Sequence, residues 1–198
     1  MIVVFDLDGT LVDASRLHAK ILSEVIGVDV RPEDVYSSSS LGFLVMKNLP
    51  KGKWSSIKDI TRQHEAAMLE NVRLVEPMQG VYKMLQKLRC KKAIFTSASR
   101  RLTDAIMEHC NLRGYFDMVV TKDDVGRTKP DPEGLIVISD ELDDTRMVMV
   151  GNGERDLLAA KKFGIPFVLF SPSGKRISTA DYVVSSLEDV PGLLDSLS

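Results

Sequence analysis

Short apolar runs with strand character recur along the chain, and longer stretches with helical spacing of apolar residues lie between them. The apolar runs cover residues 2–5, 93–95, 118–120, 147–150, 167–170 and, with a weaker pattern, 182–184. Helical spacing covers residues 80–88, 101–110, 132–138 and 156–163, and Gly164 then provides a helix stop. This alternation predicts an α/β fold in which a doubly wound, mostly parallel sheet carries helices on both faces.

The first and second predicted strands are separated by far more residues than one crossover helix needs. Within this gap, residues 15–26, 41–49 and 55–70 have helical patterns of their own. We therefore predict that a small α-helical domain is inserted after the first strand. In this division residues 1–13 and 79–198 form the core, and residues 14–78 form a helical cap domain.

Two carboxylates follow the first strand directly. Residues 2–5 are apolar throughout, as in a strand buried on both faces, and Asp6 and Asp8 come next. Side chains two positions apart on an extended backbone point the same way, so these two acids face one space and repel each other. Such a pair requires a cation, a shared proton or a function. Gly9 allows a close turn around a bound group, and Thr10 can fix that turn.

More polar residues follow the other predicted strands. The carboxyl ends of parallel strands meet at one edge of an open sheet, where ligands bind. That edge collects hydroxyls, a lysine, an amide and another acid, namely Thr96, Ser97, Lys129, Asn152 and Asp156. A carboxylate can attack phosphorus when Mg²⁺ and a lysine compensate the approach of two anions, while hydroxyls and amides hold the transferring oxygens. A second acid can protonate the leaving group and then activate water, so the set fits phosphoryl transfer through an aspartyl intermediate.

Four stretches of the chain resemble the motifs of a known hydrolase family. They are FDLDGTLVD, the hydroxyl-bearing TSAS after the second strand, Lys129 before Pro130, and GNGERD. In this order and over the whole chain they resemble the haloacid dehalogenase-like hydrolases, and KPDP and SAS are similar to the phosphoglycolate phosphatase and β-phosphoglucomutase branch. The resemblance implies a Rossmann-like core with an inserted helical cap, Mg²⁺ as cofactor and a small phosphorylated metabolite as substrate.

The resemblance also implies a role for each matching residue. Asp6 would be the nucleophile and first Mg²⁺ ligand, and Asp8 the general acid and base, with its backbone carbonyl on the metal as well. Thr96 would hold the phosphate together with the Ser97 amide, although an alignment shifted by one residue gives this role to the Ser97 hydroxyl. Lys129 would balance the negative charge.

The GNGERD motif departs from the family pattern at one position. Asp156 matches the acid that holds the metal or its waters, but Asn152 stands where the family usually carries a metal-ligating Asp. An amide oxygen can ligate, but Mg²⁺ prefers anionic or water oxygens. The implied metal ligands are therefore Asp6, Asp8, Asn152 and Asp156. Asn152 in place of Asp should affect the metal affinity of this site more than the reaction itself.

Some of these residues also have ordinary structural explanations. Thr96 or Ser97 could cap the following helix, Lys129 could lie in a solvated loop, and Asp156 could be an N-cap or first-turn acid in addition to any metal role. His18, His64 and His109 lie in helical patterns without metal-ligand spacing, so we expect surface or packing roles for them. The basic stretch of Lys47, Lys51 and Lys53 around Trp54 is either a solvated face or a charge offered to a substrate.

Composition and charge narrow the possible partners. Of the 198 residues, 44% are hydrophobic and 27% are charged, which is ordinary for a globular protein, and the formal net charge is −2. This charge gives no reason to expect nucleic acid or an anionic membrane as a partner. No apolar run approaches the ~20 residues that span a bilayer, and no signal-peptide pattern precedes the first strand. Cys90 and Cys110 stand alone, so we expect a reducing, cytoplasmic environment.

We therefore predict a Mg²⁺-dependent phosphatase that acts on a small phosphorylated metabolite through an aspartyl-phosphate on Asp6. A phosphomutase would use the same core, and a cap lysine or arginine that grips a second phosphate would favour it. A dehalogenase is disfavoured because halide departure needs no acid, whereas Asp8 supplies one. A non-catalytic binding protein is the other alternative, and Asn152 is the feature that favours it.

Overall fold

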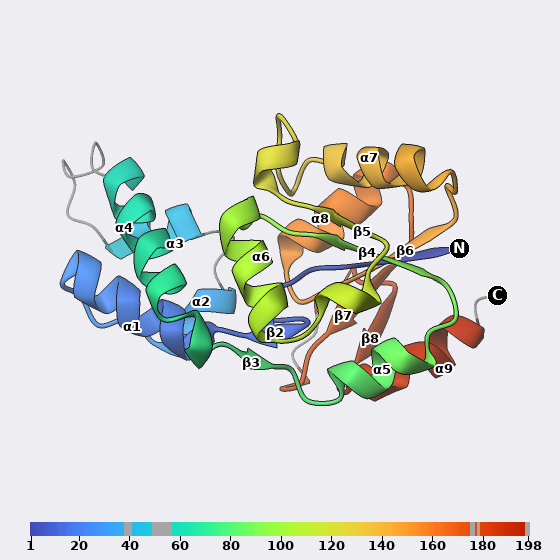
Figure 1. The fold of residues 1–198 in the computed structure, drawn as a ribbon, viewed down its shortest axis with the longest axis horizontal. Coiled ribbons are helices and arrows are strands. Elements are labelled where there is room, and N and C mark those ends of the chain that lie inside the picture. The colour runs from blue at the N-terminus through green and yellow to red at the C-terminus, as the bar shows by residue number, and fades with distance from the viewer. Residues whose placement is uncertain (38–40, 49–56, 175–176, 178, 197–198) are drawn as a thin grey trace.

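A six-stranded parallel sheet forms the centre of the molecule (Figure 1). The computed structural model describes residues 1–37, 41–48, 57–174, 177 and 179–196. The strands of this sheet are β1 (Ile2–Phe5), β4 (Lys91–Phe95), β5 (Met118–Val120), β6 (Met147–Gly151), β7 (Phe167–Phe170) and β8 (Tyr182–Val184). Their order is β5-β4-β1-β6-β7-β8, and every neighbouring pair is parallel. The predicted fold class is confirmed, and β1 lies in the middle because its residues are buried on both faces.

Helices cover both faces of this sheet (Figure 1). α7 (Glu133–Leu142) and α8 (Glu154–Phe163) pack on one face, and α5 (Val81–Lys87), α6 (Arg100–His109) and α9 (Val190–Asp195) pack on the other. α8 ends at Gly164 in the left-handed conformation, as predicted. α7 runs beyond its predicted end because Ser139 and the acids after it continue the helix with polar side chains that the apolar pattern does not register.

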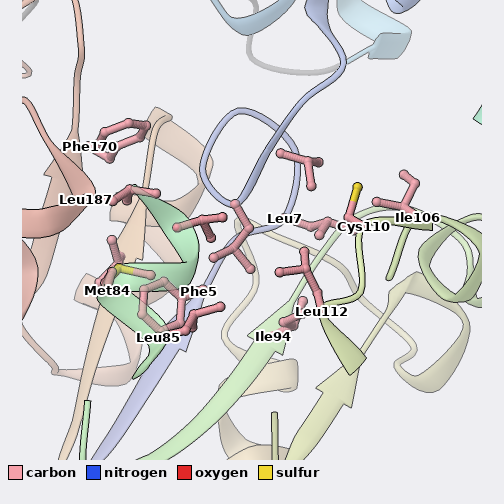
Figure 2. Packing of buried hydrophobic residues seen from close by; sticks show 14 of the residues in the cluster. Phe5, Leu7, Met84, Leu85, Ile94, Ile106, Cys110, Leu112, Phe170 and Leu187 are labelled. Carbon is pink, nitrogen blue, oxygen red and sulfur yellow. The ribbon is translucent and has the colours of Figure 1, made fainter. Parts of the chain in front are cut away.

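Alternate residues of β1 enter different hydrophobic clusters. Val3 and Phe5 belong to a cluster with residues of α5, α6 and α9, whereas Ile2 and Val4 pack with residues of α7 and α8. Figure 2 shows the first of these clusters, with Phe5 beside Met84 and Leu85 of α5. Because both faces of the strand are buried, β1 and the residues that follow it are held firmly in place.

The segment between β1 and α5 is mainly helical. Its helices are α1 (Ser15–Ile26), α2 (Pro32–Ser37), α3 (Leu41–Asn48) and α4 (Ile57–Glu70). The predicted helices over residues 15–26, 41–49 and 55–70 correspond to α1, α3 and α4, while Leu49, Ser55 and Ser56 lie outside the described residues. α1, α3 and α4 share a separate hydrophobic cluster that includes Leu22, Leu44 and Ile60. The division into residues 14–78 and the remainder stays a prediction.

Short elements that the hydrophobic pattern did not predict join these parts. β2 (Val12–Asp13) pairs antiparallel with β3 (Glu76–Pro77), which brings the two ends of the helical segment together. In the described residues, the single-turn 3₁₀ helices are Val72–Leu74, Arg113–Tyr115, Lys122–Asp124 and Leu187–Asp189. Two- and three-residue elements are too short to show a hydrophobic period. In the part of the chain that the structure describes, no helix combines the length and apolar character needed to cross a bilayer.

Candidate active site

A tight turn at the end of β1 sets the positions of Asp6 and Asp8. Gly9 has φ 80°, the left-handed conformation that glycine tolerates, and its N–H donates to the Val12 carbonyl at 2.8 Å. The Leu7 carbonyl accepts from several of the following amides, including that of Leu11 at 2.9 Å. Backbone hydrogen bonds therefore close the turn that we predicted at Gly9. The Thr10 hydroxyl, which could have fixed this turn, has no hydrogen-bond partner among the described residues.

Lys129 brings together Asp6, which follows β1, and Asp156, which lies in the first turn of α8 after the neighbouring strand β6. Its Nζ donates to Asp6 Oδ1 at 2.5 Å and to Asp156 Oδ1 at 2.7 Å, and all three residues are buried. The same ammonium lies 5.5 Å from the centre of the Phe95 ring, within the range of a cation–π contact. Lys129 is therefore not a solvated loop lysine but a buried cation held between two carboxylates.

Asp156 has the first-turn position that the sequence allowed, and it also contacts Lys129, while its metal role stays a prediction. Its Oδ2 accepts from the Gly153 N–H at 3.1 Å at the start of α8, while its Oδ1 accepts from Lys129. The close approach depends on Gly151, because a Cβ there would lie 2.5 Å from Asp156 Oδ2. Asp156 is thus both a first-turn acid of α8 and a part of the charged cluster.

The electrostatics of this cluster favour a further cation. Burial, followed by the nearby charge of Asp156, raises the pKa of Asp6 to about 7, although Lys129 opposes the shift. Burial by itself would lower the pKa of Lys129, but the charges of Asp156 and Asp6 outweigh it and raise that pKa. One ammonium does not compensate Asp6, Asp8 and Asp156, so a divalent cation beside Asp6 would keep it ionised at neutral pH.

The hydroxyls after β4 differ in their contacts. Thr96 Oγ1 accepts from the Ala98 N–H at 3.1 Å, and Ser99 Oγ caps α6 by accepting from the Leu102 N–H at 3.2 Å. The capping role that we considered for Thr96 or Ser97 thus belongs to Ser99. Within the described residues, Ser97 Oγ is buried without a hydrogen-bond partner, which is costly unless a bound group satisfies it.

Asn152 follows β6, whose Val150 is the register neighbour of Phe5 on β1. Asn152 therefore lies at the same edge of the sheet as Asp6, and its side chain is half-buried. Among the described residues, no three Asp, Glu, His or Cys side chains form a metal-binding group by themselves. The predicted metal set differs from such a group because it also uses an amide and a backbone carbonyl, and its excess of negative charge fits a hard cation.

Several polar and charged groups near this edge were not predicted as site residues. His18 Nε2 lies 3.8 Å from Asp8 Oδ1, and His18 Nδ1 lies 2.9 Å from His64 Nε2. Glu65 on α4 accepts from Ser99 Oγ at 2.5 Å and from Lys122 Nζ at 2.9 Å, so the helical segment is tied to the core. Sequence spacing gives no signal for these contacts, because the residues involved are far apart in the chain.

Arg155 is another charged residue that the motif analysis did not select. It is half-buried, and its guanidinium donates to Thr128 Oγ1 at 3.3 Å. Burial lowers the pKa of Arg155, and the charges of Asp156 and Asp6 oppose that shift. The Arg155 guanidinium therefore lies near enough to these two carboxylates to interact with their charges. Of the basic stretch considered as a substrate contact, Lys47 is exposed on α3, and residues 51–54 lie outside the described residues.

Comparisons with known proteins identify the family of the chain. A phosphoglycolate phosphatase of Aquifex aeolicus is 27% identical over 209 residues, covering 98% of this chain and 97% of that protein. Pyrophosphatase PpaX of Halalkalibacterium halodurans is 28% identical, with 98% and 94% covered. The crystal structure of a predicted phosphoglycolate phosphatase from Haemophilus somnus has a TM-score of 0.82 at 17% identity, with 98% and 97% covered. The model of the haloacid dehalogenase-like hydrolase family matches residues 3–170, most of the chain, and the protein therefore belongs to this family of hydrolases.

Proposed function

We propose that this hydrolase is a Mg²⁺-dependent phosphatase that cleaves a small phosphorylated metabolite through a covalent aspartyl-phosphate on Asp6. The observation that carries the proposal is the buried Asp6 carboxylate, hydrogen-bonded to Lys129 and followed two residues later by Asp8. Relatives named phosphoglycolate phosphatase and pyrophosphatase support a small phosphorylated substrate. An Asp beside a buried lysine can approach a phosphate dianion because the lysine reduces the repulsion.

In the first step, Asp6 attacks the phosphorus atom of the substrate. Since Asp6 Oδ1 accepts from Lys129, we assign the attack to Oδ2. The new bond joins this oxygen to phosphorus, the bond from phosphorus to the leaving oxygen breaks, and Asp8 donates a proton to that oxygen. The products of the step are a free alcohol and an aspartyl-phosphate on Asp6.

In the second step, water replaces the Asp6 carboxylate on phosphorus. Asp8, now ionised, takes a proton from the water molecule. The water oxygen bonds to phosphorus at the same time, and the bond from phosphorus to Asp6 breaks. This step restores the ionised Asp6 and the protonated Asp8 and releases inorganic phosphate. Asp8 therefore serves as acid and then as base, which is why two acids at this spacing are needed.

Hydroxyl and amide donors would hold the non-bridging oxygens of the phosphate. The Ser97 hydroxyl is the better candidate for this contact, because the Thr96 hydroxyl already accepts from the Ala98 amide. This difference supports the alignment shifted by one residue, and the Thr96 hydroxyl can still donate its own proton. Gly9 and Thr10 would place the turn after β1 against the same group.

Asp6, the Asp8 backbone carbonyl, Asn152 and Asp156 would hold the Mg²⁺ ion. When bound, Mg²⁺ supplies positive charge that stabilises the transferring phosphoryl group and lowers the repulsion between anions. Burial and the charge of Asp156 raise the pKa of Asp6, and this raised pKa supports the need for a cation beside Asp6.

Turnover of 4-nitrophenyl phosphate in Mg²⁺ and in excess EDTA tests the proposed function. We expect inorganic phosphate to be released only with Mg²⁺, and a screen of phosphorylated metabolites should then identify better substrates. A phosphomutase would instead return the phosphoryl group to a second hydroxyl with little release of phosphate. Absence of turnover on every ester, with the protein folded and Mg²⁺ present, would contradict the proposal and favour a binding protein.

The variant Asn152→Asp tests the position of the metal. A unit negative charge about 4 Å from the divalent Mg²⁺ is worth on the order of 8 kcal/mol at an effective dielectric of about 20, before desolvation and repulsion among the acids cancel most of it. We expect a net gain of roughly 1–2 kcal/mol, or about tenfold, in Mg²⁺ affinity. The measurement is the Mg²⁺ concentration that gives the half-maximal rate at fixed ionic strength. An unchanged or higher midpoint would show that Asn152 does not face the metal.

A further inference from the structure

Asp8 has an oxygen that lacks a hydrogen-bond donor. Among the described residues, Asp8 Oδ1 is buried and has no hydrogen-bond partner. His18 on α1 lies beside this oxygen, and its Nε2 is 3.8 Å away, slightly beyond a hydrogen bond. Hydrogen bonds of catalytic groups are often long before substrate binds and shorten in the reactive complex. A small rotation of either side chain would bring His18 within reach of this oxygen.

A second histidine fixes the far side of the His18 ring. His64 on α4 is only 2% exposed, and its Nε2 lies 2.9 Å from His18 Nδ1. The two rings are nearly parallel, at 10°, with their centres 4.9 Å apart. Burial, followed by the neighbouring His18, lowers the pKa of His64 to about 3, so His64 is a neutral imidazole with one N–H.

We propose that His64 and His18 form a hydrogen-bonded chain that orients the carboxyl group of Asp8 for proton transfer to the leaving group. In this chain His64 Nε2–H donates to His18 Nδ1, and His18 Nε2–H donates to Asp8 Oδ1. His64 is a positioning residue, because it reaches Asp8 only through His18. The inference rests on the proposed function, in which Asp8 is the acid.

The chain determines which oxygen of Asp8 carries the proton. A donor at Oδ1 disfavours a proton on that atom, so the acidic proton resides on Oδ2, which is available for the leaving group. The bond from His64 keeps His18 Nδ1 unprotonated, and the ring N–H is then on Nε2, the nitrogen that faces Asp8. Both histidines belong to the helical segment, so the contact with Asp8 also couples that segment to the proton-transfer group.

The alternative explanation is that His64 only fills space between α1 and α4. His64→Phe keeps a ring of similar size but removes the donor, and His64→Gln retains an N–H near the position of Nε2. His109→Gln, at the exposed end of α6, is the matched control for loss of an imidazole. Thermal unfolding of each variant measures the packing contribution separately.

The leaving group distinguishes positioning from packing. Benzyl phosphate releases a basic alkoxide that needs a proton, whereas 4-nitrophenyl phosphate releases a stable phenolate. In single-turnover experiments, we expect His64→Phe to slow alcohol release from benzyl phosphate about tenfold and release from 4-nitrophenyl phosphate less than about twofold, with KM unchanged. His64→Gln should recover most of the loss, and His109→Gln should match the wild type.

A measurement independent of turnover follows the imidazole protons directly. Long-range ¹H–¹⁵N spectra of the histidine rings should show His18 with its proton on Nε2 in the wild type and a mixture of tautomers in His64→Phe. Equal losses on both esters, or an unchanged His18 tautomer in His64→Phe, would overturn the inference while leaving the phosphatase proposal intact. Failure of the wild type to hydrolyse either ester would instead overturn the phosphatase proposal, and this inference with it.

Discussion

Asp6→Asn should lower the rate of phosphate-ester hydrolysis by at least about three orders of magnitude, equivalent to about 4 kcal/mol in the activation barrier. The amide keeps the size and shape of the carboxylate, but its oxygen is a poor nucleophile and cannot form the aspartyl-phosphate. Lys129 would then retain Asp156 as its charged partner, at 2.7 Å, so the buried ammonium stays compensated. The loss should therefore appear in the chemical step rather than in the fold.

The measurement is the single-turnover rate with 4-nitrophenyl phosphate in saturating Mg²⁺, with circular dichroism as a check on folding. Asp140→Asn is a matched control because Asp140 is exposed on α7. Mass spectrometry must show that the amide at position 6 has not hydrolysed back to the acid. A rate above about a tenth of the wild-type value, with deamidation excluded, would mean that Asp6 is not the nucleophile.

Asp8→Asn should give the second-largest effect, and the size of that effect should depend on the leaving group. Alkyl phosphates leave as strongly basic alkoxides, so we expect the phosphorylation step to slow by about 10²–10³-fold for benzyl phosphate. A nitrophenolate leaves without a proton, and the same step with 4-nitrophenyl phosphate should slow less than about tenfold. Single-turnover bursts of alcohol release isolate this step from hydrolysis of the intermediate.

Asp8 also activates water in the second step, so the variant should accumulate phosphorylated enzyme with the aryl ester. Acid quenching followed by intact-mass measurement would detect the added phosphoryl group on Asp6. Equal losses for the two esters would indicate that Asp8 contributes a general electrostatic or structural effect rather than a proton. Asp123→Asn serves as the control for loss of an acid near the edge of the sheet, because Asp123 is exposed on the 3₁₀ turn after β5.

The sequence alone determined the sheet and the edge at which Asp6, Lys129 and Asp156 meet. Strands of a parallel sheet are buried on both faces, so each appears as a continuous apolar run such as residues 2–5 or 167–170. The carboxyl ends of such strands meet at one edge, which is why Asp6, Lys129 and Asp156 could be grouped before their contacts were known.

The tertiary structure decided which of these groups pair and how. Hydrophobic periodicity predicts the face on which a side chain lies, but it carries no information about which distant residue it meets. The burial of Lys129 between two acids and the distinct contacts of Thr96 and Ser97 therefore came from the packed structure. The division of the chain into core and cap remains a prediction from the length of the helical segment.

The histidines show the limit of the sequence most clearly. We expected surface or packing roles for His18 and His64, because their spacing matched no metal site and nothing in a linear pattern joins positions 46 residues apart. Packing of α4 against α1 places the two imidazoles in contact and His18 near Asp8. The sequence determines which residues can form the edge of the sheet. Packing between helices that are distant in sequence determines which side chains lie beside those residues, because such contacts form only when the chain folds.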